Sequence, residues 1–363
     1  MLKSLSCNLP PRRDVCFSET GHDSRLKLKS EFENHMRSNF HKLILLAACV
    51  CAFRLTADAA ELKRADVMAD PVWLLHVDCD ALRTNTIGQF FLSEMDKPEA
   101  KAKLASFQTT FGFDLRNQVH GYTLYGSSLT PTDGVLIVYA DFDADRLVTL
   151  AQGADEYQSS AHNQHTIHSW IDANMNRKSG IGHRVYAAFE GKRVILGQRE
   201  NRVTEALDVI DGTSPSLDGG STFPSLGLPG NGHFIEAAAR KMDSTNLAPS
   251  AAILKLSKSV QVVAGEQDNQ FQGTLTLAAN SDDAANQIFS IAQGLVTVMK
   301  LQSNNQDVGK LANAVTLTQN GSEILGKLTL PADDLVAMLQ SAAQRMAAAR
   351  AARAAQAAQA AQQ

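Results

Sequence analysis

Residues 119–152 constrain the fold of this chain more than any other stretch, because two short apolar segments are followed there by a helical one. The segments VHGYTLYG and VLIVYA predict two antiparallel strands, and ADRLVTLAQ predicts a helix. A helix that follows a hairpin can cover one of its faces and bury the apolar side chains there. We expect two groups of side chains to pair across this hairpin: Tyr122 and Leu124 with Val135, Ile137 and Tyr139.

The same order of hairpin and helix recurs three more times along the chain. A hairpin at 184–197 precedes a helix at 200–210, and two later hairpins turn at 267–269 and 320–321. In the later strands, polar and apolar residues alternate strictly, in TLTL at 274–277 and in VTLT at 315–318. This alternation predicts one solvent-exposed face and one buried face. Recurrence of this unit predicts an α+β fold of two related halves built from ββα units, with antiparallel sheets that carry helices packed on one face.

The two helices that follow the later hairpins have capping residues at their starts. Asn280 or Ser281 is expected to cap one helix, and Pro331 begins the other. In the first of them an apolar stripe is expected to cover the preceding hairpin, with Leu275 and Leu277 among the buried strand residues. The stripe consists of Ala284, Ile288, Ile291, Leu295, Val298 and Met299.

The region before residue 119 and the region after 157 contain fewer regular patterns. VWLLHV at 72–77 predicts a strand, and ALRTNTIGQFFLSEM at 81–95 predicts one helix. A second helix is expected to begin at Pro98 and to end at Gly112. Residues 158–182 are polar and predict one short strand and a long loop.

Composition suggests where the domains begin and end. The segment 213–232 is rich in Ser, Gly and Pro and has no apolar period, which is typical of a linker. We therefore expect a first α+β domain at 60–212 and a second at 233–346. Residues 347–363 are rich in Ala and Gln and favour a helix, but their three-residue repeat builds no apolar stripe and predicts a solvated tail.

Residues 36–59 have the three parts of a secretory signal peptide. Arg37 and Lys42 form the charged part, an apolar run follows, and Ala-Asp-Ala at 57–59 fits the small-x-small cleavage rule. An alternative lies inside this leader, because Leu-Ala-Ala-Cys ending at Cys49 resembles the lipobox of bacterial lipoproteins, in which the cysteine is acylated. Both interpretations predict an extracytoplasmic protein, either periplasmic or secreted, or anchored to the membrane as a lipoprotein.

Residues 1–35 are polar and unpatterned. We interpret them either as a disordered extension or as sequence upstream of a true start at Met36. Four of the five cysteines precede residue 60, so if the leader is removed after Ala59, Cys79 alone stays in the mature chain and can form no internal disulfide.

The charge balance argues against nucleic acid as a partner. Nine of the 34 Lys and Arg and six of the 38 Asp and Glu precede residue 60, which leaves 25 against 32, or −7, in the rest of the chain. A surface that binds a polyanion needs an excess of cations, and no basic run is interleaved with aromatic residues. We predict no nucleic-acid partner, and contact with a membrane only through a lipid anchor at Cys49.

Three histidines at intervals of three form the best metal candidate: His162, His165 and His168. On a helix this spacing would bring the imidazoles to one side, where they could share a zinc ion. In a strand, His165 and His168 would point to opposite faces, and the H-E-x-x-H pattern is not present. The alternative is a polar loop whose histidines bind nothing.

Asp141, Asp143 and Asp145 begin like a calcium loop of the EF-hand type. The position that needs Gly holds Arg146, and the position that needs a bidentate Glu holds Gln152. Capping of the following helix explains these carboxylates without a cation. The same arrangement precedes residue 81, at Asp78 and Asp80, so carboxylates from the two strand ends could meet if these ends are neighbours.

These patterns leave three functions open. No G-x-S-x-G, C-x-x-C or G-x-G-x-x-G motif is present, so we predict no cofactor and assign no catalytic residue. The first function is a non-enzymatic binding or envelope-associated protein. The second is an exported hydrolase, assisted by a metal ion bound at 162–168. The third is a carrier of a lipid or another hydrophobic molecule, which would need an apolar cavity between sheet and helices.

Overall fold

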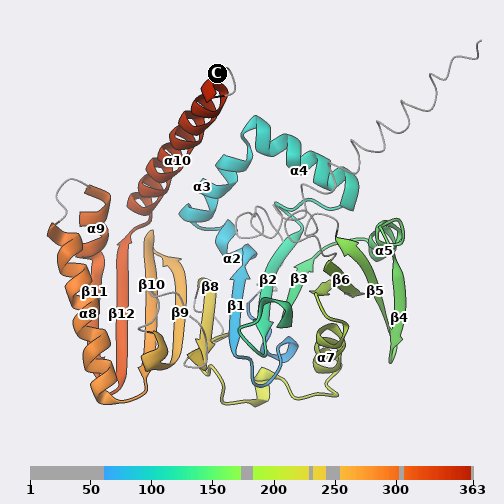
Figure 1. The fold of residues 1–363 in the computed structure, drawn as a ribbon, viewed down its shortest axis with the longest axis horizontal. Helices are drawn as coiled ribbons and strands as arrows, with labels where there is room; N and C mark the ends of the chain where they lie inside the picture. Colours follow the sequence, from blue (N-terminus) through green and yellow to red (C-terminus); the bar gives the residue numbers. More distant parts are fainter. Residues whose placement is uncertain (1–60, 173–182, 229–231, 243–253, 302–305, 361–363) are drawn as a thin grey trace, which may run out of the picture. The chain divides into compact units, whose positions relative to one another are not determined.

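The structure is a computed structural model that describes residues 61–172, 183–228, 232–242, 254–301 and 306–360. The predicted leader, Cys49 and the N-terminal extension lie outside the described residues. The described chain is mixed α+β, with twelve antiparallel strands in one sheet (Figure 1). The strand order is β11-β12-β10-β9-β8-β1-β2-β3-β7-β6-β5-β4. The predicted α+β class is therefore confirmed.

The secondary-structure elements follow the chain in this order. The first part contains β1 (Trp73–Asp78), α2 (Cys79–Arg83), α3 (Thr86–Met95), α4 (Pro98–Phe111), β2 (Val119–Gly126), β3 (Gly134–Ala140) and α5 (Ala144–Gln152). The middle contains β4 (Gln158–His162), β5 (His165–Asp172), β6 (His183–Glu190), β7 (Arg193–Gly197) and α7 (Glu200–Ile210). The last part contains β8 (His233–Arg240), β9 (Ser257–Gln267), β10 (Gln270–Ala279), α8 (Asp282–Leu301), α9 (Gln306–Ala314), β11 (Val315–Asn320), β12 (Glu323–Pro331) and α10 (Ala332–Ala360).

The sheet continues across the two predicted halves without a break. Strand β1 pairs with β2 on one side and with β8 on the other, and Leu74 lies opposite both Tyr125 and Ala238. Part of the predicted linker is also packed into the core, since Leu217 and Leu226 are buried. The division into two related halves is therefore not confirmed.

The predicted pairing across the organising hairpin is wrong by one residue. Tyr122 lies opposite Val138, and Leu124 lies opposite Leu136. The loop between the strands sets this register by pairing Gly126 with Gly134. Because strand side chains alternate, a shift of one residue moves every partner to the other face of the sheet.

The single helix predicted at 81–95 is two helices, because Asn85 interrupts it. Asn85 has an extended backbone, and its side chain accepts a hydrogen bond of 2.8 Å from the Gly88 backbone N–H, which begins α3. A Cβ on Gly88 would lie 1.7 Å from the Leu82 carbonyl oxygen, so this junction requires glycine. The predicted helix beginning at Pro98 is confirmed as α4, and Gly112 ends it with a positive φ of 87°.

The long loop predicted after residue 157 is wrong in its first part. Residues 158–172 form the hairpin of β4 and β5, with Asn163 at its turn in a left-handed conformation (φ 52°). The remaining positions, 173–182, lie outside the described residues. The hairpin places all three candidate histidines on strands.

The main core lies between the sheet and α7, which follows the second predicted hairpin (Figure 1). Ile137, Ile167 and Ile195 on the strands pack with Val203 and Leu207 on the helix. All five side chains are almost fully buried, so this helix covers its hairpin as predicted.

Candidate functional site

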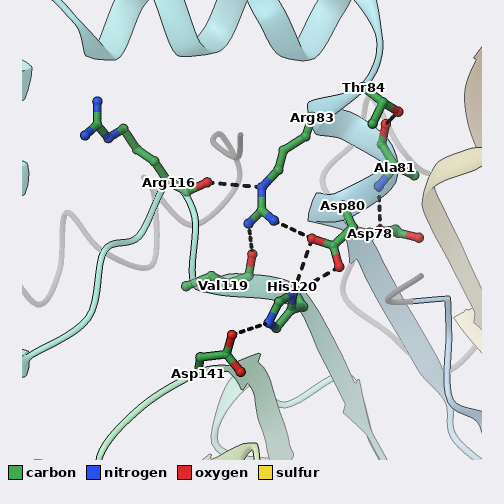
Figure 2. A network of polar contacts seen from close by, with 9 residues as sticks. All are labelled: Asp78, Asp80, Ala81, Arg83, Thr84, Arg116, Val119, His120 and Asp141. Carbon is green, nitrogen blue, oxygen red and sulfur yellow. Dashed lines mark hydrogen bonds and ion pairs between the residues drawn. The ribbon is translucent and has the colours of Figure 1, made fainter. Parts of the chain in front are cut away.

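A polar network joins the ends of three adjacent strands in the middle of the sheet: the ends of β1 and β3 and the start of β2. Strands β1 and β3 run parallel to each other because both pair antiparallel with β2, so Asp80 and Asp141 follow neighbouring strand ends. His120, near the start of β2, lies between them (Figure 2). Its Nδ1 lies 3.0 Å from Asp80 Oδ2, and its Nε2 lies 3.1 Å from Asp141 Oδ2.

Two cations complete this network. The Arg83 guanidinium forms an ion pair with Asp80 and donates hydrogen bonds to the Val119 carbonyl and, at 3.1 Å, to the Arg116 carbonyl (Figure 2). Lys192 Nζ lies 2.7 Å from Asp141 Oδ1. The carboxylates are thus balanced by side chains from α2, β2 and the β6–β7 turn.

The other carboxylates in this region begin helices, as the capping interpretation predicts. Asp78 Oδ1 accepts a hydrogen bond of 2.8 Å from the Ala81 backbone N–H, and Asp143 Oδ1 accepts one of 3.2 Å from the Arg146 backbone N–H. Burial raises the pKa of Asp78 to about 6. Asp145 lies in the first turn of α5, where an acidic side chain meets the positive end of the helix dipole.

The surroundings of His120 favour its charged form. Each ring nitrogen faces a carboxylate acceptor, and both nitrogens can donate together only when the imidazole is protonated. The hydrogen bond to Asp80 raises the pKa of His120 against the opposing effect of its partial burial, and Asp141 adds to the rise. Lys192, and after it His120, lower the pKa of Asp141.

His120 is expected to titrate at a higher pH than His168 and His233, whose pKa values burial lowers. Because the folded-state pKa of His120 is raised, its contribution to stability is complete below the unfolded value of about 6.5 and is lost as the pH rises through the folded value. NMR titration of the imidazole resonances measures all three groups in one sample. Asp80→Asn should lower the pKa of His120 and leave that of His233 unchanged. A measured pKa of His120 equal to or lower than that of His168 would contradict this prediction.

The three candidate histidines lie on β4 and β5 but do not converge. His162 Nε2 lies 2.7 Å from Asp208 Oδ1, and His165 Nε2 lies 2.8 Å from Asp211 Oδ2. His168 points to the other face of the hairpin, where its Nδ1 lies 2.9 Å from the Tyr157 hydroxyl.

His165 contacts a second carboxylate, since its Nδ1 lies 2.6 Å from Glu190 Oε1. Burial by itself lowers the pKa of His165, but Asp211 and Glu190 more than offset it, so the net shift is upward. These histidines therefore hold the β4–β5 hairpin to the end of α7 and to β6.

Within the part of the chain that the structure describes, no group of three or more His, Cys, Asp or Glu side chains is placed to hold a metal ion. Among the predicted ligands, His162 and His165 lie opposite each other across the hairpin but are engaged by different carboxylates. Asp141 contacts Lys192 and His120, whereas Asp143 caps α5.

His120 was not among the residues predicted from the sequence. Its position one residue after Val119 carries no motif, and only the pairing of β2 with both neighbours brings it between Asp80 and Asp141. One sequence feature could have indicated it. If the carboxylates at the two strand ends are neighbours, as the sequence allowed, a basic side chain on the strand between them would face both.

Helix α8 presents a second candidate surface. Its first two turns pack against Leu277 and Ile324 through Ala284 and Ile288. Beyond Ile288 the same helix carries four large aliphatic side chains that are more than half exposed, and we call them the aliphatic face of α8. They are Ile291 (52%), Leu295 (61%), Val298 (54%) and Leu301 (76%).

The prediction that the apolar stripe of this helix covers its hairpin thus holds for the first part of the helix only. Leu277 is 5% exposed, whereas Leu275, two residues earlier on the same face of β10, is 39% exposed. Helix α8 runs beside β11 and β12 and contacts α9 (Figure 1). Neither the strands nor α9 bury the aliphatic face.

Comparison with known proteins gives little further information. No protein-family model matches this chain, and no curated protein matches it. Two solved structures that it resembles are crystal forms III and I of TP0453. Form III has a TM-score of 0.41 and 12% identity, over 79% of this chain and 100% of that chain. Form I has a TM-score of 0.39 and 9% identity, over 80% of this chain and 99% of that chain. Likeness at this level says nothing about what this chain binds.

No α-helix among the described residues is both long enough and apolar enough to span a membrane.

Proposed function

We propose that this chain is an extracytoplasmic, non-enzymatic binding protein whose binding surface is the aliphatic face of α8. The observation that supports this function is the exposure of four large aliphatic side chains in succession on one helix. Single exposed apolar residues are ordinary on protein surfaces, but a contiguous group marks a site of interaction.

The polar clusters support a non-enzymatic function. His120 joins Asp80 to Asp141, and His165 joins Asp211 to Glu190, so these imidazoles tie elements of the fold together. A general base needs a position from which it can reach a substrate proton. Here both ring nitrogens of each histidine already face carboxylates of the protein.

Export is the part of this proposal that rests on the sequence. Mass spectrometry of the N-terminus of the protein from its own host tests it directly. A chain that begins at Ala60 or Glu61, or at an acylated Cys49, agrees with the proposal. A chain that retains Met1 or Met36 contradicts it.

Covalent footprinting of aliphatic side chains tests the binding surface without knowledge of the partner. The protein is labelled once in the intact host envelope and once after purification. We expect Leu295 and Leu301 to be labelled less in the envelope, and Met346, an exposed apolar residue on α10, to be labelled equally in both. Equal labelling of all three residues in the two samples would refute the proposed surface.

A further inference from the structure

We propose that the aliphatic face of α8 binds the surface of a phospholipid bilayer, an inference that rests on the proposed function and names the partner. It concerns Ile291, Leu295, Val298 and Leu301, and it is argued from their exposure, their chemistry and the charges around them.

The aliphatic face continues the stripe that begins the helix. Ile288, Ile291, Leu295 and Val298 follow one another at intervals of three or four, so they lie on one side of α8. Ile288 is buried against the sheet, while the later members are each more than half exposed. Side chains that line a narrow groove are shielded from solvent by the residues on its other side. Because these side chains are each more than half exposed, they favour an extended partner that contacts the helix along its length.

The chemistry of this face favours lipid over a protein partner. Protein interfaces are centred on Trp, Tyr and Arg anchors, which bury large amphipathic side chains in matching pockets. The residues from 290 to 301 include no aromatic residue and no arginine, and the exposed members of the stripe are Ile, Leu and Val. Aliphatic side chains enter the hydrocarbon boundary of a bilayer without leaving a polar group unpaired.

The charges on α8 agree with this orientation. Between Asp283 and Lys300 the helix has no charged residue, so its aliphatic face can enter the boundary between headgroups and acyl chains without burying a charge. Asp282 and Asp283 lie at the end that packs on the sheet. Lys300 lies at the exposed end, where an ammonium group meets lipid phosphates and its aliphatic stem extends along apolar surface.

Four half-exposed aliphatic side chains give reversible binding, and stable attachment to a bilayer takes two signals. The predicted acylation of Cys49 would supply a second one. Eleven residues separate Cys49 from Glu61, the first described residue, and such a segment reaches at most about 40 Å. The proposal for α8 does not depend on this anchor, which would only raise the local concentration of bilayer.

Sedimentation with phosphatidylcholine vesicles tests the proposal. Every protein compared is the full chain with Leu45→Asp and Leu46→Asp, so that the predicted leader does not itself enter the bilayer. The test variant is Leu295→Gln with Leu301→Gln, since glutamine keeps the helix propensity. The matched control is Met346→Gln, which removes an exposed apolar side chain from α10. Circular dichroism checks that all variants keep the same helix content.

We expect the double variant on α8 to lower the partition coefficient roughly tenfold or more, and the control on α10 to change it less than about twofold. Equal partition of the parent and the α8 variant would overturn the proposal. If the vesicle test fails but footprinting shows that Leu295 is protected in the envelope, the aliphatic face of α8 is still a binding surface, and its partner is not the bilayer.

Light scattering of the same proteins tests a second copy of this chain as the partner. A dimer of the parent that dissociates in the α8 variant would show that the face is covered by that copy, and it would also overturn the bilayer proposal. A monomer in both proteins, together with vesicle binding lost only in the α8 variant, supports it.

Discussion

Replacing Asp66 by alanine is expected to lower the free energy of unfolding by about 3 kcal/mol, since the partly buried Arg193 loses its buried ion-pair partner. Asp66 lies at the end of a short 3-10 helix (Arg64–Asp66) and is buried. Its Oδ2 accepts hydrogen bonds of 2.8 Å from Arg193 Nε and 3.0 Å from the Tyr139 hydroxyl, and its Oδ1 accepts one of 3.1 Å from Arg193 Nη2. Without the carboxylate, the buried Tyr139 hydroxyl and the partly buried Arg193 guanidinium both lose this acceptor.

Urea denaturation of the variant and the parent measures this loss. Asp96→Ala is the matched control, because Asp96 is exposed and pairs with Arg116 at 3.2 Å on the surface. Such a pair is worth less than about 1 kcal/mol. Replacing Arg193 by methionine in the Asp66→Ala background should recover part of the loss, since the unpaired charge is removed. If Asp66→Ala cost no more than Asp96→Ala, the pair of Asp66 and Arg193 would not have the stabilising role given to it here.

The second large effect is expected at Arg64, whose guanidinium holds the segment after α7 to the rest of the protein. Its nitrogens donate hydrogen bonds to four backbone carbonyls, which belong to Leu217 (2.8 Å), Thr222 (3.3 Å), Phe223 (2.8 Å) and Leu226 (2.9 Å). Arg64→Met keeps much of the apolar stem but leaves these carbonyls without their charged donor. We expect a loss of about 3 kcal/mol, because hydrogen bonds to a charged group contribute more than neutral ones but do not add fully.

Hydrogen exchange separates a local from a global effect of Arg64→Met. The amide of Leu217 donates to the Val67 carbonyl and that of Leu226 to the Phe223 carbonyl, so both amides should exchange faster in the variant. Arg345→Met is the control, because Arg345 is exposed and its ion pair with Asp307 is long, at 3.5 Å. Unchanged exchange at both amides would mean that the segment is held by its buried side chains alone.

The candidate sites show which features of this protein local sequence patterns predict and which they do not. Asp78 and Asp143 cap helices as predicted, because capping depends on the few residues around each helix start. The neighbourhood of Asp80 and Asp141 depends on β2 pairing with both β1 and β3, and the place of His120 depends on the register of those pairs. Register is a long-range property, since the loop between two strands decides which side chains meet.

The apolar stripe of α8 shows that burial, like strand register, cannot be predicted from local spacing alone. Spacing alone predicts that Ile288 and Leu295 share a side of the helix, and they do. Spacing does not show how far the covering strands extend. The contacts with Leu277 and Ile324 end after the first turns, so Ile288 is buried and Leu295 is exposed.

Most of the strands and helices of this protein, and its α+β class, follow from local patterns, because apolar periods, caps and turn residues act over a few neighbouring positions. Long-range packing is what joins the two predicted halves in one sheet, places His120 between two carboxylates and leaves the outer part of α8 uncovered. Each of these depends on which distant segments pair and where their contact ends. Strand pairing between residues far apart in the chain supplies that information, and no local pattern contains it.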